Sequence, residues 1–416
     1  MPTGSFRSLI IPNFGLPFSP KPRSFIRKER KKKKKQKMAP ENHLSVRAVL
    51  AGLLAASGPG VVAAVPNGRL HELATAAGKL YFGTAVDNPE IKDNTYKTIL
   101  GNKFDFGQVT VGNTQKWQFT EPNQGKFDYR QADEIVNFAK SNGQQIVRCH
   151  TLVWHNQLPS WVESGNWNRD SLTRVINTHV SNVVGHYKGQ CYAWDVVNEA
   201  LEDNGNFRNS VFYRVLGTDY LPIAFKAAAA ADANTKLYYN DYNIEQAGNK
   251  QQQALKIVDI IKRGGARIDG VGLQGHFIVG QTGSRDQLAA VLNSFVAKGV
   301  DVAYTEVDVR HSSLPPNARA LQQQADDYGN IVGACLAVKR CVGITVWGAS
   351  DAHSWIPSVF PGQGAATLLD ANNNPKPAYN KVRDVLGAAG QNAGGQVRRR
   401  RSRRARQARK ARAVKA

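Results

Sequence analysis

The sequence lacks the short motifs that hold metals, phosphates and N-linked glycans. It has only four cysteines in 416 residues, with no C-x-x-C pair and no Cys/His spacing typical of a metal site. No glycine-rich turn follows the first strand-like segment, where nucleotide-binding α/β sheets carry one. No Asn-x-Ser/Thr sequon is present either. The sequence therefore predicts no metal, no cofactor and no N-glycosylation.

Acidic residues are scarce, since 32 Asp and Glu stand against 55 Lys and Arg, for a formal charge of +23. Residues 1–37 and 396–416 each carry +11, so the chain between them is nearly neutral. Residues 396–416 contain no aromatic side chain, so we expect a disordered tail that contacts nucleic acid or another polyanion non-specifically, without a functional role. The global charge therefore describes the two tails rather than the folded body.

Long hydrophobic runs are missing as well. The apolar run over residues 48–56 is too short for a membrane span. It follows Arg47 and precedes small residues up to Ala64, which is the pattern of a signal peptide over residues 38–64. We interpret residues 1–37 as an upstream extension of the gene model, with translation beginning at Met38; a genuine basic leader, nuclear or membrane-directed, is the alternative. The sequence thus predicts a secreted, extracellular protein without a membrane segment.

The cysteines divide into two expectations. Cys335 and Cys341 lie between the end of a predicted helix and the start of the next strand, close enough for a disulfide. Cys149 and Cys191 are expected toward opposite ends of neighbouring strands, too far apart to pair, and are predicted to be free buried thiols.

Strand-like and helix-like segments alternate between residue 65 and about residue 390. The helical pattern is clearest over residues 172–187, where apolar residues recur at spacings of three and four. Eight such alternations predict a single (β/α)₈ barrel domain over residues 65–386, followed by a Gly/Ala-rich linker and the basic tail over 387–416. An open doubly wound sheet is the alternative. The strand candidates are 81–87, 104–112, 145–154, 192–199, 236–243, 270–276, 302–309 and 343–351.

Polar and aromatic residues gather at one end of these strands, which in a barrel is where active sites lie. Scattered polar residues of a core would not share one end. They are Asn113, Lys116, His150, Trp154, His155, Asn198, Glu199, Asn240, Tyr242, Gln274, His276, Glu306, Asp308, Trp347 and Asp351.

Two of these residues fit the chemistry of a retaining glycosidase, which needs one protonated and one ionised carboxyl. Glu199 and Glu306 end the fourth and seventh strands, which lie across the barrel from each other. His276, held by Asp308, is placed to hydrogen-bond Glu306 and keep it ionised as the nucleophile. Glu199 is expected to keep its proton as the general acid, and later to activate water.

The remaining residues fit the walls of a sugar site. Trp154, Trp347 and Trp355 can pack against apolar sugar faces, and Asn198 is placed to bond a 2-hydroxyl. Lys116, His150, Gln274 and Asn240 are further hydroxyl partners. Trp117, Trp161 and Trp194 are assigned to the structural core.

At these residues the chain resembles family 10 glycoside hydrolases, the secreted endo-β-1,4-xylanases. The resemblance runs from about Leu73 to Leu386. Its motifs are Gly107-Gln-Val-Thr, Lys116-Trp117, Cys149-His-Thr-Leu-Val-Trp-His-Asn-Gln-Leu-Pro-Ser-Trp161, Trp194-Asp-Val-Val-Asn-Glu199, Tyr239-Asn-Asp-Tyr-Asn-Ile-Glu245, Gly272-Leu-Gln-Gly-His276, Thr305-Glu-Val-Asp308, Gly343-Ile-Thr-Val-Trp-Gly348 and Asn374-Pro-Lys-Pro-Ala-Tyr379.

The resemblance implies retaining hydrolysis of internal β-1,4 bonds in xylan, with Glu199 as acid/base and Glu306 as nucleophile. Xylan and xylooligosaccharides are then the binding partners, and we expect a monomer without an obligate protein partner. Mannanases and cellulases that place glutamates on the same two strands are the rival enzymes. The sequence departs from the family at Gly112, where a Glu that contacts a more distant sugar is usual, so weaker binding of that sugar is expected.

Overall fold

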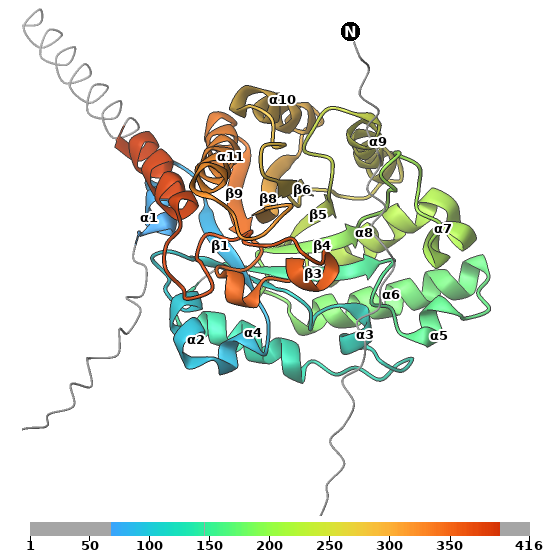
Figure 1. The fold of residues 1–416 in the computed structure, drawn as a ribbon. Coiled ribbons are helices and arrows are strands. Elements are labelled where there is room, and N and C mark those ends of the chain that lie inside the picture. The colour runs from blue at the N-terminus through green and yellow to red at the C-terminus, as the bar shows by residue number, and fades with distance from the viewer. Residues whose placement is uncertain (1–67, 145, 392–416) are drawn as a thin grey trace, which may run out of the picture. The chain divides into compact units, whose positions relative to one another are not determined.

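The computed structural model describes residues 68–144 and 146–391, which form a closed barrel of parallel strands surrounded by helices (Figure 1). Neighbouring strands pair in parallel, and the last strand pairs with the first, which closes the ring. The predicted (β/α)₈ barrel is confirmed, and the open doubly wound sheet is excluded. The barrel strands are β1 (Tyr81–Val86), β2 (Gln108–Val111), β3 (Ile146–Trp154), β4 (Ala193–Asn198), β5 (Lys236–Asp241), β6 (Gly270–Leu273), β8 (Asp301–Arg310) and β9 (Cys341–Val346).

A short additional strand, β7 (His276–Ile278), pairs with the C-terminal part of β8, while β6 pairs with the N-terminal part of that strand. The chain therefore bends between β6 and β7, and both strands pair with β8. This bend carries Gln274 and His276 across the end of the barrel.

Helices lie around the strands (Figure 1). They are α1 (Leu70–Ala76), α2 (Asn94–Leu100), α3 (Trp117–Thr120), α4 (Arg130–Ser141), α5 (Ser160–Glu163), α6 (Arg169–His186), α7 (Val211–Leu216), α8 (Tyr220–Ala231), α9 (Asn249–Arg263), α10 (Arg285–Val296), α11 (Ala318–Ala337) and α12 (Ile356–Val359), with short 3₁₀ turns at Glu90–Lys92, Gly217–Asp219 and Asp351–His353. A further helix covers residues 377–391.

Helix α6 illustrates how a cap and apolar residues at spacings of three and four specify a helix. Asn168 and Ser171 form a reciprocal capping box that satisfies backbone N–H groups at its start. Seven of its residues are buried, among them Leu172, Ile176 and Val180, and they recur on one face. Removing the cap by Asn168→Ala should cost about 1 kcal/mol.

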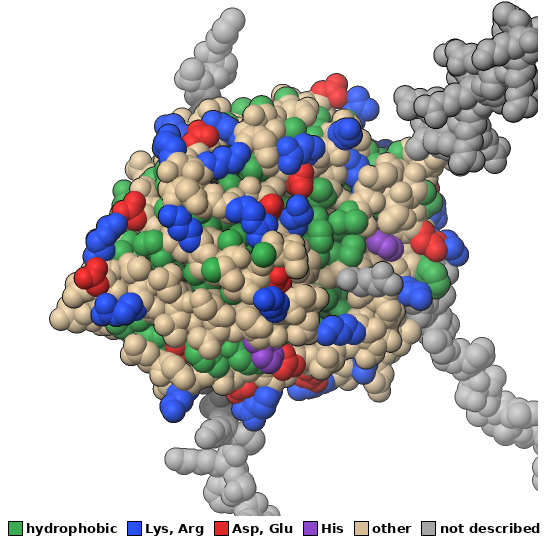
Figure 2. Space-filling view, turned by 180° about the vertical axis from the view of Figure 1, so that it is seen from behind, with side chains coloured by type: hydrophobic (Ala, Val, Ile, Leu, Met, Phe, Trp, Pro, Cys, Tyr) green, Lys and Arg blue, Asp and Glu red, His purple; other side chains and the backbone are tan. Residues whose placement is uncertain are grey.

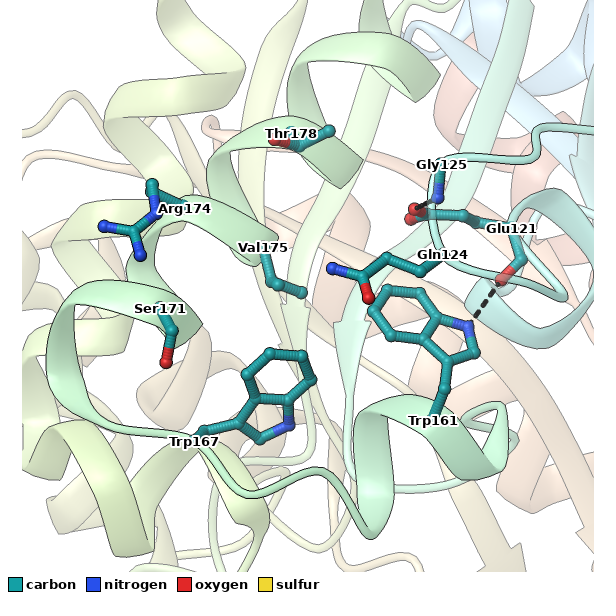
Figure 3. Close-up of a pocket in the computed structure, with 9 residues that line it drawn as sticks. All are labelled: Glu121, Gln124, Gly125, Trp161, Trp167, Ser171, Arg174, Val175 and Thr178. Atoms are coloured by element: carbon teal, nitrogen blue, oxygen red, sulfur yellow. Dashed lines mark hydrogen bonds between the residues drawn. The ribbon is translucent and has the colours of Figure 1, made fainter.

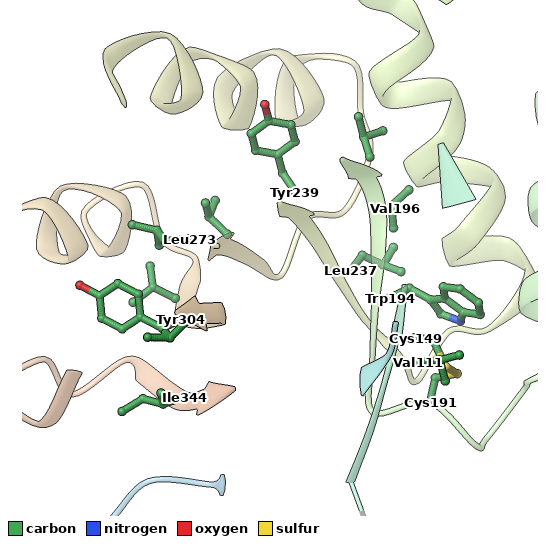
Figure 4. Close-up of a cluster of buried hydrophobic side chains, with 14 of the residues drawn as sticks. Val111, Cys149, Cys191, Trp194, Val196, Leu237, Tyr239, Leu273, Tyr304 and Ile344 are labelled. Carbon is green, nitrogen blue, oxygen red and sulfur yellow. A yellow bond between two sulfur atoms is a disulfide. The ribbon is translucent and has the colours of Figure 1, made fainter. Parts of the chain in front are cut away.

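The core lies on both sides of the strands. Trp194, Val196, Leu237 and Tyr239 belong to the main apolar cluster between strands and helices (Figure 4). Successive residues of a strand point to opposite faces, so Tyr238 belongs instead to a small second cluster with Ala193 and Ala303. Both faces of the strands are thus buried, which is why their sequences read as nearly continuous apolar runs.

Both cysteine pairs are disulfides. Cys335–Cys341 was predicted and is confirmed. The prediction of free thiols at Cys149 and Cys191 is wrong, because these residues are bonded with their Cα atoms 5.8 Å apart. The strand register explains the error: Arg148 pairs with Ala193, so Cys149 lies near the start of β3, beside the segment that leads into β4.

Charges are mixed on the surface of the barrel. Figure 2 shows Lys and Arg side chains distributed over one face with Asp and Glu among them. This agrees with the near-neutral charge of the central sequence. Among the described residues, no helix is long and apolar enough to cross a membrane, and no group of three His, Cys, Asp or Glu could hold a metal ion.

The ends of the domain are joined to each other. The backbone N–H of Gly68 donates to the Tyr379 hydroxyl, and that hydroxyl donates to Asp105. The helix over 377–391 continues into the segment that was interpreted as a linker from residue 387. The leader, the signal peptide and the arginine-rich tail lie outside the described residues, so the predictions about them stay predictions.

Candidate active site

The two glutamates lie at β4 and β8, which are separated by β5 and β6, and the structure brings the predicted residues together around them. Glu199 directly follows β4, and Glu306 lies within β8. Their side chains are 13% and 7% exposed, so both carboxyls are largely withdrawn from water. Gln274 touches both residues, since its side-chain amide donates to Glu199 Oε1 and its backbone carbonyl accepts the N–H of Glu306.

Glu199 is held by neutral hydrogen-bond donors. Trp154 Nε1 donates to Oε2 at 2.8 Å, Gln274 Nε2 to Oε1 at 3.0 Å, and Asn198 Nδ2 to Oε1 at 3.3 Å. The backbone of Glu199 has a φ of +51°, a left-handed conformation that costs roughly 1–2 kcal/mol. Its N–H donates to the carbonyl of Asn240, and its carbonyl accepts from Arg208, and these bonds help to hold this conformation.

The protonation of Glu199 differs from the sequence-based expectation. Burial raises its pKa, but a charge on His155 and the hydrogen bonds from Gln274 and Trp154 lower it, and the net direction is downward. Burial lowers the pKa of His155 to about 4, so His155 is neutral above that pH. Near neutral pH the lowering therefore comes from the hydrogen bonds and Arg208. Without substrate, Glu199 is therefore ionised near neutral pH. The sequence-based expectation was a protonated carboxyl.

Glu306 is held by a positive charge. His276 Nε2 lies 3.3 Å from Glu306 Oε2, and its Nδ1 lies 3.0 Å from Asp308 Oδ2. Burial lowers the pKa of His276, but Asp308 and Glu306 outweigh it and raise that pKa to about 10. The imidazolium therefore donates to both carboxylates. Asp308 is fixed in turn by Trp355 Nε1, which donates to it at 2.8 Å. The predicted contact of His276 with Glu306, supported by Asp308, is confirmed.

Asn240 has a different task from the one expected. It was predicted to bond sugar hydroxyls, but it is fully buried. Its side-chain Nδ2 donates to Asn198 Oδ1 at 2.9 Å and to Glu306 Oε1 at 2.8 Å, and its side-chain Oδ1 accepts from the Thr305 hydroxyl. Both amide hydrogens are used, so Asn240 positions Glu306 and Asn198 instead of facing a ligand.

Asn113 and Lys116 form a chain of polar contacts on one flank of the site. Lys116 Nζ donates to Asn113 Oδ1 at 2.8 Å and lies 4.8 Å from the centre of the Trp154 ring. Asn113 Nδ2 donates to Asp87 Oδ2 at 2.6 Å. A Cβ at Gly112 would lie 3.0 Å from both Asp87 carboxylate oxygens, so this carboxylate closely approaches the backbone of Gly112.

His150 and the two tryptophans line the flank toward Glu306. His150 Nδ1 lies 3.0 Å from Asp195, which also forms a buried ion pair with Arg148. The Trp347 ring centre is 5.6 Å from that of His150, and the Trp355 ring centre is 5.1 Å from that of His276. These half-buried indoles keep part of their surface open to a ligand.

Comparison with known proteins agrees with this geometry. The family model described as glycosyl hydrolase family 10 matches residues 69–385. The chain belongs to this family. The resemblance found in the sequence is thereby confirmed, and the protein is a glycoside hydrolase.

Similar proteins and structures carry related names. The chain is 55% identical to "Endo-1,4-beta-xylanase 1" of Humicola insolens over 327 residues, 78% of this chain and 76% of that protein. It is 52% identical to "Endo-1,4-beta-xylanase 5" of Pyricularia oryzae over 353 residues, 83% and 87% of the two chains. A solved endo-1,4-β-xylanase of Penicillium canescens aligns with a TM-score of 0.74 at 42% identity, covering 77% of this chain and 97% of that one. A family 10 xylanase of a Bispora species, solved with xylobiose, gives 0.73 at 43%, covering 76% and 99%.

Three residues with contacts in the site were not identified as candidates from the sequence, and a fourth was identified without a role. Asp87 directly follows β1, so the rule of strand ends could have found it. Asp195 lies inside β4, and Arg208 lies in the loop after that strand, so neither carries a positional signal. His155 was noted at a strand end but given no role, although its Nδ1 lies 3.9 Å from Glu199 Oε2.

Tyr242 lies beside Arg208 rather than beside the glutamates. Its hydroxyl accepts from Arg208 at 3.1 Å, and Lys250 Nζ is 3.4 Å from its ring centre. Burial raises the pKa of Tyr242 to about 12, so it stays neutral. Arg208 also donates to the backbone carbonyl of Glu199. Tyr242 therefore helps to position Arg208, and through it the backbone of Glu199.

Proposed function

We propose that the protein is an endo-1,4-β-xylanase that cleaves internal bonds of xylan with retention at the anomeric carbon. The observation that carries this proposal is the asymmetry of the two carboxyls. Glu306 lies against the positive His276, whereas Glu199 accepts hydrogen bonds from neutral groups. Glycoside hydrolysis requires two carboxyls with different tasks, and a carboxylate held against a positive histidine suits the nucleophile of a retaining enzyme. The names of the similar proteins support xylan as the substrate.

In the first step Glu306 attacks the anomeric carbon, and Glu199 gives its proton to the departing glycosidic oxygen. Glu199 acquires this proton when the bound sugar excludes water, since added burial raises the pKa of a carboxyl. In the second step Glu199 removes a proton from water, which releases the sugar from Glu306. Asn198, fixed by Asn240 and Gln274, is placed to bond the sugar 2-hydroxyl.

The assignment of roles is tested with two alanine variants on xylan and on an aryl xyloside whose leaving group needs no proton. Glu306→Ala should lower kcat on both substrates by on the order of 10⁴-fold or more, because the covalent step is lost. Glu199→Ala should lower kcat on xylan by about 10²–10⁴-fold. It should keep a rapid first turnover on the aryl xyloside.

Glu163→Ala, an exposed carboxylate on α5, is the matched control and should behave as wild type. Proton NMR of the first products should show the β-anomer. An α-anomer, or retained activity in Glu306→Ala, would overturn the mechanism. Sugar release from mannan or carboxymethylcellulose at the rate seen with xylan would instead overturn the substrate.

Secretion is part of the same proposal. Two disulfides, including one that joins β3 to the segment before β4, suit an oxidising compartment. N-terminal sequencing of the native protein should give a chain that begins near Val65. A native chain that begins near Met1 would contradict both the signal peptide and the proposed extension.

A further inference from the structure

A second pocket lies on the flank of the barrel, and its residues take no part in the contacts of the two glutamates. Its volume is about 310 Å³, within the usual range of small-ligand sites. Its walls come from the segment after α3, from α5, from the segment between α5 and α6, and from the N-terminal part of α6 (Figure 3). The lining residues are Glu121, Gln124, Gly125, Trp161, Trp167, Ser171, Arg174, Val175 and Thr178.

Two tryptophans form the apolar part of this pocket and are held in place by the backbone. Trp161 Nε1 donates to the carbonyl of Glu121 at 3.2 Å, and Trp167 Nε1 donates to that of Val162 at 2.8 Å. The ring centres are 6.3 Å apart with their planes at 76°. Both indoles are half-buried, so part of each ring faces the open space in Figure 3.

The acidic residue of the pocket is already engaged. Glu121 Oε1 accepts the N–H of Gly125 at 2.8 Å, and Oε2 lies 2.9 Å from His179 Nδ1. Glu121 is also buried, so it gives the pocket little negative character. A metal ion or a cationic ligand therefore finds no free carboxylate among these residues.

The border of the pocket carries polar side chains without partners. Gln124, Arg174 and Thr178 are exposed, and their side chains form no hydrogen bond within the described part of the chain. An amide, a guanidinium and a hydroxyl beside two aromatic faces match the chemistry of a sugar ring, which has apolar faces and hydroxyls at its edge. One arginine alone is a weak basis for a phosphate or nucleic-acid site.

We propose that this pocket is a second carbohydrate site, which binds one or two units of the xylan chain away from the bond that is cleaved. This inference rests on the proposed activity on xylan. The pocket starts five residues after Lys116 and belongs to the connections that follow β2 and β3, so it shares their end of the barrel with the catalytic residues. Two weak contacts with one polymer raise the apparent affinity, while a short oligosaccharide gains nothing from the second.

The test compares binding to insoluble xylan with hydrolysis of xylotriose. Trp167→Ala, placed in a Glu306→Ala background to prevent digestion, should weaken binding to insoluble xylan by about tenfold, because an aromatic contact is lost. Arg174→Ala should weaken it by roughly threefold. With Glu306 intact, both variants should cleave xylotriose within about twofold of wild type, since that substrate occupies only the catalytic site.

The controls separate the possible failures. Arg319→Ala on α11 removes another exposed arginine, one that has no hydrogen bond or ion pair to any described residue, and the variant should bind xylan as wild type does. If Trp167→Ala does not fold by circular dichroism, Arg174→Ala, which changes an exposed residue, decides. Unchanged binding of folded variants by an enzyme that hydrolyses xylan would overturn the second site. A wild type that binds xylan but does not hydrolyse it would overturn the proposed function and leave the pocket standing.

Discussion

The surroundings of Glu306 and Glu199 differ in the kind of group that each carboxyl meets. Glu306 lies between a charged histidine and the amide of Asn240, with Asp308 and Trp355 behind the histidine. Glu199 meets an indole, two amides and a histidine that is neutral above about pH 4. The first arrangement keeps a positive charge beside the carboxyl up to about pH 10, because the pKa of His276 is raised to about 10. The second allows Glu199 to be protonated and deprotonated, because no lysine or arginine among the described residues contacts its carboxyl oxygens.

The difference shows how two carboxyls at the same end of the barrel can have different protonation behaviour. A carboxylate that must attack carbon needs stable ionisation, and a charge-assisted hydrogen bond provides it. A carboxyl that must donate and accept a proton needs a pKa that changes when bound substrate excludes water. Neutral hydrogen-bond donors allow the pKa to rise with burial.

Among substitutions that change the surroundings of the two carboxyls and leave both glutamates in place, the largest effect is expected from His276→Gln, which keeps a hydrogen-bond donor but removes the positive charge. We expect kcat on xylan to fall by about 10²-fold, comparable to loss of a charge-stabilising donor elsewhere. The acidic limb of the pH–rate profile should also move to higher pH, because the ionised Glu306 loses its cation. His186→Gln, an exposed histidine bonded to Asp133, is the control and should leave both unchanged. An unchanged acidic limb in His276→Gln would show that the charge is not what distinguishes Glu306.

His276 also links stability to pH. Its pKa is raised in the folded protein to about 10, above the ordinary value of 6.5, so the folded state holds the proton more tightly. This stabilisation is complete below pH 6.5 and is lost as the pH rises to 10, by on the order of a few kcal/mol. Urea unfolding at pH 6, 8 and 10 should show this fall in wild type and a smaller one in His276→Gln. Equal slopes in the two proteins would mean that the charge is not buried as described.

A matched pair of substitutions compares the two sides with the same chemical change. Trp154→Phe removes the N–H donated to Glu199, and Trp355→Phe removes the one donated to Asp308. Losing one hydrogen bond to the ionised form should raise the pKa of Glu199. This should increase kcat/KM on the basic side of the profile by up to about fivefold. Trp355→Phe should leave the basic limb in place. A basic limb that moves in both variants, or in neither, would remove the contrast.

Much of this arrangement could be predicted because the active site of such a barrel lies at the C-terminal ends of its strands. Glu199, Glu306, Asp308 and His276 were placed correctly from their positions alone, since each stands at the end of an apolar run. The role of Asn240 was not, because its position indicates a location but not which neighbours consume its amide hydrogens. The Cys149–Cys191 disulfide was missed for a related reason: it depends on the register between β3 and β4, which the apolar pattern leaves open.

The smallest effect is expected at His155, although it lies 3.9 Å from Glu199. Burial lowers the pKa of His155 to about 4, so at pH 6 this residue carries no charge that could act on Glu199. His155→Asn should therefore change kcat/KM on xylan by less than roughly threefold at pH 6. Below pH 4 the wild type gains a positive neighbour for Glu199 and the variant does not, so the two pH profiles should diverge only there. A loss at pH 6 as large as that of His276→Gln would mean that both carboxyls depend on a charged histidine, and that the asymmetry between them lies elsewhere.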